Sequence, residues 1–120
     1  MKRLAAVPGL DPQVGINSLA GKTASYIRLL RKFAERQSTE MANLRQAMTE
    51  ADSVTAKRIT HTLKGLAGTM GALSLQASVE CLDAAIRDKL EAEEIGPLSE
   101  TVMAEYAVLA EAILTGLTDP

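Results

Sequence analysis

The chain has 120 residues, which suits one domain with one core. Hydrophobic residues make up 47% of it and aromatic residues only 2%, so aliphatic side chains must fill the core, and packed helices are favoured over a β-sandwich. The net charge of −2 and the scarcity of aromatic rings exclude an extended basic or base-stacking surface, so no nucleic-acid partner is expected.

The N-terminal part predicts a short helix ahead of the main bundle. Residues 1–10 carry no clear pattern and are expected to form a linker or tail. Asp11 followed by Pro12 predicts a helix that ends near residue 19, because aspartate caps helix N-termini and proline suits the first turn. We therefore place a single domain at residues 11–118.

A long helix is predicted next. Apolar residues recur every three or four positions from Ile27 to Ala51, and the one polar residue in this stripe is Gln37. A kink is expected near Ser38 and Thr39, although no proline or glycine breaks the stretch.

Three more helices complete the predicted bundle. Asp52 begins the first and Gly71 ends it, Ser74 begins the second, and Gly96-Pro97 begins the third. The fold class is therefore all-α, an antiparallel four-helix bundle with the short additional N-terminal helix. The expected core residues of these three helices are Ile59, Leu63, Leu66 and Met70, then Leu75, Val79, Leu82 and Ile86, then Val102, Tyr106, Leu109, Ile113 and Leu117.

The sole histidine, His61, lies on an unusual stripe of its helix. The apolar seam lies on the opposite side, so the stripe is expected to face solvent. A glycine inside a helix costs roughly 1 kcal/mol relative to alanine, so two glycines on an exposed face predict a surface kept bare for another protein. The residues that share this stripe with the histidine are Lys57, Arg58, Lys64, Gly65 and Gly68.

The segment from His61 to Ala72 resembles the histidine phosphotransfer (HPt) domains of two-component phosphorelays. The pattern of that family is His-x-Leu-Lys-Gly-x-Ala-x-x-x-Gly-Ala, and every fixed position is filled here. The similarity extends over roughly residues 10–115, with Asp83 where many members have glutamate. Some members are the C-terminal domain of a hybrid sensor histidine kinase, and the linker-like residues 1–10 favour that setting.

The resemblance implies a phosphorelay intermediate. His61 would accept a phosphoryl group from the aspartate of a receiver domain and pass it to another receiver. Lys64 would pair with the phosphoryl oxygens, while Gly65 and Gly68 would leave room for the receiver. Neutral imidazole is the nucleophilic form of histidine and is well populated near neutral pH.

Further expectations concern partners and cofactors. Lys57 and Arg58, together with Lys64, would complement the acidic pocket of a response regulator receiver domain. The chain would be a phosphoryl carrier, not an ATP-dependent kinase, because it has no glycine-rich nucleotide loop. With one histidine and one cysteine, no metal or cofactor of its own is expected, and Mg²⁺ would belong to the receiver. We expect a monomer.

The single cysteine bears on the cellular compartment. Cys81 cannot form an internal disulfide, which fits a reducing cytoplasm, and it is expected to pack in or against the core. No stretch is long and apolar enough for a signal peptide or a membrane span. A cytoplasmic domain, free or tethered to a membrane-bound sensor kinase, is predicted.

Two other functions remain open from the residues. The chain could be a non-catalytic helical adaptor, in which the glycines serve docking and His61 is incidental. It could also be an enzyme that uses His61 as a general base together with Glu80 or Asp83.

Overall fold

The structure, a computed structural model, describes residues 2–118 and is all-α, as predicted. No strand occurs within that range. The helices are α1 (Lys2–Ala5), α2 (Pro12–Ser18), α3 (Thr23–Glu35), α4 (Gln37–Thr49), α5 (Ser53–Met70), α6 (Leu73–Arg87) and α7 (Ala92–Thr118).

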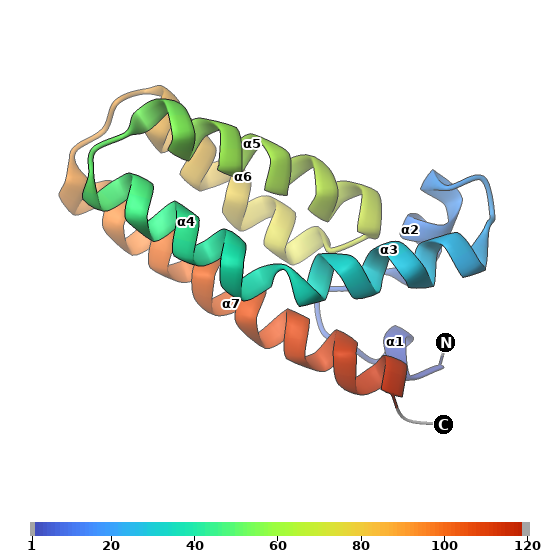
Figure 1. Ribbon diagram of the computed structural model, residues 1–120. Coiled ribbons are helices and arrows are strands. Elements are labelled where there is room, and N and C mark those ends of the chain that lie inside the picture. Colours follow the sequence, from blue (N-terminus) through green and yellow to red (C-terminus); the bar gives the residue numbers. More distant parts are fainter. Residues whose placement is uncertain (1, 119–120) are drawn as a thin grey trace.

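The helices α3 to α7 form the body of the molecule. Figure 1 shows α3 and α4 end to end, with α5, α6 and α7 beside them in alternating directions. Helix α5 packs on α6, and α7 packs on α6, α3 and α4. The junction between α3 and α4 lies at Arg36, slightly before the expected kink at Ser38 and Thr39. The arrangement leaves one side of α5 uncovered.

The predicted core is largely confirmed, with one exchange on α5. Ile59, Leu63 and Met70 are buried, but Leu66 is 43% exposed and Ala67 takes its place in the core with no exposed surface. The small methyl group of Ala67 suits the close approach of α5 and α6, which make the most extensive helix–helix contact in the molecule. The side chain of Leu66 lies outside this contact and therefore remains partly on the surface.

The N-terminal stretch is not a free tail in the structure. Leu4, Val7 and Leu10 are buried in the core, and α1 packs against α7. The prediction of a linker or tail over residues 1–10 is corrected for this described part, while Met1 lies outside the described residues. Pro8 and Gly9 obscure the apolar spacing, because both residues usually mark a loop. The domain boundary at 11–118 stays a prediction.

Two helix starts differ from expectation. Helix α6 begins at Leu73 with Ala72 as its N-cap, so Ser74 lies inside the helix. Helix α7 begins at Ala92, which places Pro97 inside it. Pro97 is the sixth residue of this helix, beyond the first four N–H groups that have no intrahelical acceptor, so α7 lacks one hydrogen bond, the one to the carbonyl of Glu93.

Gly71 ends α5, as predicted, and the reason is visible in its contacts. Its φ of +81° is left-handed, and a Cβ there would lie 2.1 Å from the carbonyl oxygen of Asp11. The backbone N–H of Asp11 in turn donates to the carbonyl of Gly71 at 2.8 Å. Ser18 Oγ donates to the carbonyl of Thr69 and Tyr26 Oη to that of Met70, both at 2.8 Å. The last three carbonyls of this helix end are thus bonded to earlier segments.

Tyr26→Phe is expected to lower the free energy of unfolding by about 1 kcal/mol at neutral pH, because the Met70 carbonyl loses its donor. Burial raises the pKa of Tyr26 from 10.0 to about 12, with a smaller contribution from the Asp11 charge. The stabilisation is therefore complete below pH 10 and is lost as the pH rises toward 12. Urea unfolding of both proteins at pH 7 and between pH 10 and 11.5 checks this. A difference that stays constant above pH 10 would contradict it.

Candidate functional site

The side chain of His61 lies on the uncovered side of α5 and is exposed, as the stripe predicts. It makes no hydrogen bond or ion pair with any other side chain that the structure describes. Neither Glu80 nor Asp83, the acid–base partners that an enzyme of this kind would need, bonds to it. The imidazole is thus presented to solvent and is free to meet another molecule.

Lys64, one turn after His61, reaches sideways to α6. Its Nζ lies 3.4 Å from Oδ2 of Asp83, and both side chains are mostly covered. Thr60 Oγ1 lies 3.3 Å from Oδ1 of the same carboxylate, and Arg87 Nη1 lies 3.8 Å from Oδ2. Lys64 is therefore anchored by an acidic side chain of the next helix, a partner that spacing along α5 did not reveal.

The two glycines of the stripe differ. Gly65 is exposed, and a Cβ built there would meet no atom within 4 Å, so the surface beside His61 is bare. At Gly68 a Cβ would lie 2.6 Å from Nε2 of Gln76 on α6. The space at Gly68 is therefore filled by a side chain of this protein, which corrects the prediction that both positions stand open.

Lys57 and Arg58 occupy the exposed turn before His61. Arg58 also lines a small hollow between α5 and the α3–α4 junction, where Arg36 and the partly exposed Leu66 lie. The charge of Arg58 contributes to the lowered pKa of Asp52, which is set mainly by hydrogen bonds from the Thr55 hydroxyl and backbone N–H. The face around His61 is thus basic, with an apolar side chain at its edge.

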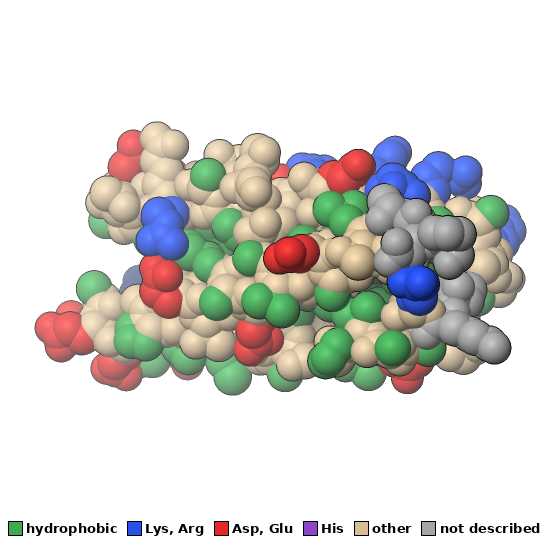
Figure 2. All heavy atoms as spheres, turned by 90° about the horizontal axis from the view of Figure 1, so that it is seen from below, with side chains coloured by type: hydrophobic (Ala, Val, Ile, Leu, Met, Phe, Trp, Pro, Cys, Tyr) green, Lys and Arg blue, Asp and Glu red, His purple; other side chains and the backbone are tan. Residues whose placement is uncertain are grey.

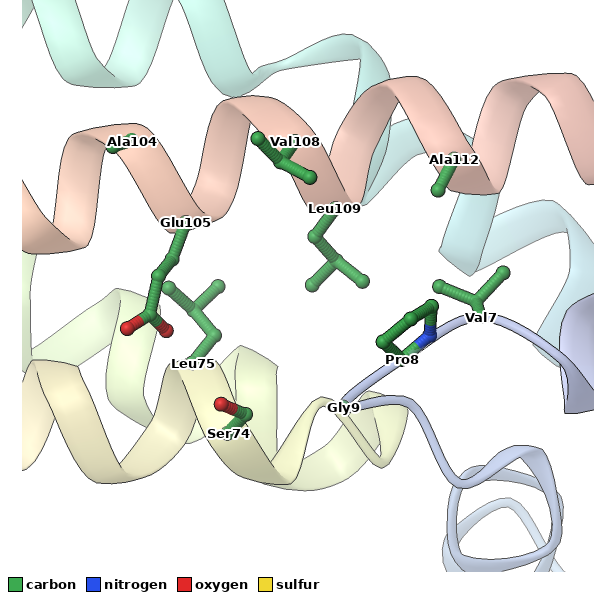
Figure 3. A pocket seen from close by; sticks show the side chains of 10 residues that line it. All are labelled: Val7, Pro8, Gly9, Ser74, Leu75, Ala104, Glu105, Val108, Leu109 and Ala112. Atoms are coloured by element: carbon green, nitrogen blue, oxygen red, sulfur yellow. The ribbon is translucent and has the colours of Figure 1, made fainter.

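Larger hollows lie elsewhere in the described part of the chain. One, of about 320 Å³, is formed by α6, α7 and residues 7–9, and Figure 3 shows Leu109 pointing from α7 toward Pro8. Figure 2 shows that apolar side chains are spread between acidic ones on the face seen from below. The second, of about 510 Å³, lies between the α4–α5 and α6–α7 turns. Neither is lined by His61.

Three further observations concern the cysteine, possible metal ligands and membrane-spanning helices. Cys81 is exposed on α6, not packed in the core, which corrects that prediction. Among the described residues, no group of three or more His, Cys, Asp and Glu side chains is placed to hold a metal ion. Within residues 2–118, no helix combines the length and apolar character that crossing a membrane requires.

Comparison with known proteins gives a consistent result. The Hpt domain family matches residues 28–114. The crystal structure of histidine-containing phosphotransfer protein B (HptB) from Pseudomonas aeruginosa PAO1 superimposes with a TM-score of 0.78, over 92% of this chain and 95% of that one. The two sequences are 23% identical, so this likeness shows a common fold. No curated protein sequence matches the chain.

Proposed function

Because the chain belongs to the Hpt domain family, whose members act in histidine phosphotransfer, we propose that His61 is the residue that carries the phosphoryl group. The observation that supports this most directly is the setting of His61. It is the one histidine of the chain, it is exposed, and the helix surface beside it at Gly65 is bare. A second protein can therefore bring its own backbone close to the ring.

The transfer step is a substitution at phosphorus. A ring nitrogen of neutral His61 attacks the phosphorus of an aspartyl phosphate in a receiver domain. The N–P bond forms while the P–O bond to the aspartate breaks, and the electron pair leaves with the carboxylate. The reverse reaction delivers the phosphoryl group to a second receiver.

The surrounding cations suit this chemistry. Lys64 lies one helical turn from His61, close enough for its ammonium to reach oxygens of a phosphoryl group on the ring. A positive charge there would stabilise the negative charge that the phosphoryl oxygens carry during transfer. Lys57 and Arg58 would favour encounter with an acidic partner surface more than raw affinity.

Hpt domains interact with response regulator receiver domains, and we propose such a domain as the partner here. The receiver stands alone or is part of a hybrid sensor kinase, and it supplies both the aspartate and the Mg²⁺. The chain itself acts as a cytoplasmic monomer that carries the phosphoryl group without ATP-dependent kinase activity and without a cofactor of its own.

The proposal predicts transfer from a phosphorylated receiver. Incubation with ³²P-labelled receiver domains of the host is expected to place label on this chain that is stable in alkali and lost in acid, as is typical of phosphohistidine. Electrophoresis after each treatment measures it. A complete absence of such label with every receiver of the host would contradict the carrier function.

A further inference from the structure

Four side chains form a charged cluster between α5 and α6, beside the proposed phosphoryl site. We define the Lys64 cluster as Thr60, Lys64, Asp83 and Arg87. Thr60 is fully buried, and its single hydroxyl hydrogen can go either to a backbone carbonyl of its own helix at 3.1 Å or to Oδ1 of Asp83 at 3.3 Å. Oδ2 of Asp83 faces Lys64 at 3.4 Å.

The carboxylate of Asp83 is well placed to compete for Lys64. Its side chain is only 13% exposed and that of Lys64 29%, so water screens this pair less than it screens surface pairs. The other cation near Asp83 is Arg87, and its attraction to the carboxylate is weaker. Its side chain is 63% exposed, and its Nη1 lies 3.8 Å from Oδ2. Lys64 is therefore the main counter-charge of Asp83 when His61 is unmodified.

A phosphoryl group on His61 would place a second anion within reach of the same ammonium. We infer that Asp83 is a positioning residue that competes with this phosphoryl group for Lys64 and so weakens the affinity of His61 for phosphoryl. The inference rests on the proposed carrier function of His61. A carrier that is too strongly stabilised in its phosphorylated form cannot pass the group on, so the competition keeps transfer reversible.

Asp83 need not lose all its partners when Lys64 turns toward His61. The Thr60 hydroxyl and Arg87 remain beside the carboxylate. A buried charge left without partners would be costly, and these two groups limit that cost. The cluster thus permits Lys64 to exchange between two anions.

The test uses potassium phosphoramidate as a small donor, so that it does not depend on a receiver. His61 attacks the phosphorus, the N–P bond to the protein forms, the P–N bond of the donor breaks, and ammonia leaves with the electron pair. At fixed phosphoramidate and ammonium concentrations, ³¹P NMR gives the equilibrium constant for this exchange. Four proteins are compared with the wild type: Asp83→Asn, Lys64→Met, the double variant, and Asp88→Asn, which makes the same change at an exposed position outside the cluster, as a matched control.

We expect Asp83→Asn to raise the equilibrium constant about fivefold, the scale of a partly exposed ion pair, because Lys64 is no longer shared. In the Lys64→Met background the same substitution should change nothing. Asp88→Asn should change the constant by less than about twofold, since the Asp88 side chain is 65% exposed. Circular dichroism and urea unfolding show whether each variant is folded. If the ion pair were merely structural, its loss would lower the stability of the protein and leave the equilibrium constant for phosphoryl exchange unchanged.

Two results would overturn the inference. One is an unchanged equilibrium constant in a folded Asp83→Asn protein. The other is an equal rise with and without Lys64, which would mean that Asp83 repels the phosphoryl group directly. Failure of the carrier function itself is distinguishable, because the wild type would then show no phosphohistidine signal at all.

Discussion

His61→Gln is expected to abolish phosphoryl uptake while the fold stays intact. The amide nitrogen of glutamine is not nucleophilic, so no N–P bond can form, and label from a phosphorylated receiver should fall by about a hundredfold or more. The side chain of His61 has no partner within the described residues, and glutamine is a good helix former, so stability should hardly change. Labelling assays and circular dichroism on the same preparations measure both effects.

The matched control for this variant is Glu80→Gln. Glu80 is likewise exposed, on α6, and it was the alternative acid–base partner. We expect it to retain wild-type labelling. Retained label in the His61→Gln protein would refute His61 as the acceptor, and loss of label in Glu80→Gln would favour an acid–base role for that carboxylate.

Gly65→Leu is expected to leave the bundle folded and still slow transfer from a receiver by about tenfold to a hundredfold. A Cβ at this position meets no atom within 4 Å, and replacing glycine should stabilise the helix by up to about 1 kcal/mol. The leucine would stand beside His61, where we propose that the receiver docks, and a misplacement of about 1 Å there is costly. Stopped-flow or quenched-flow transfer kinetics measure the loss.

Two controls separate obstruction from damage. Phosphoramidate is small, so it should phosphorylate the Gly65→Leu protein at nearly the wild-type rate. Ala107→Leu adds the same side chain at an exposed position of α7 and should leave transfer from the receiver unchanged. Wild-type transfer kinetics in the Gly65→Leu protein would show that the bare surface has no part in docking.

Features that depend on one helix were predictable from the sequence. The exposure of His61 follows from the position of Ile59 and Leu63 on the opposite side of α5, and the end of α5 follows from Gly71. The bare surface at Gly65 also follows from α5 alone, because no neighbouring helix approaches it.

Features that depend on the register between helices were not predictable. The contact of Lys64 with Asp83 and the filling of the space at Gly68 by Gln76 are set by how α6 lies against α5. The exposure of Leu66 has the same cause, because the side of α5 that α6 covers is the side of Ala67. Local periodicity gives the face of a helix to within about one residue, and that is too coarse to choose between neighbours.

The burial of Leu4, Val7 and Leu10 illustrates a further limit. Their apolar character is evident in the sequence, but a short segment with Pro8 and Gly9 has too few residues to form a periodic pattern. The segment becomes part of the core through the packing of α1 on α7, where Leu4 lies against Gly116.

The anchored end of α5 has a consequence for the thermodynamics of association. Because Asp11, Ser18 and Tyr26 hold the carbonyls of Gly71, Thr69 and Met70, the last turn of the helix that bears His61 is held against fraying. Little conformational entropy is then left to lose when a second protein settles on this helix, so more of the interaction energy appears as affinity. A rigid docking helix also allows a weak, short-lived encounter to be productive. A relay requires such encounters, because it must release one partner before it meets the next.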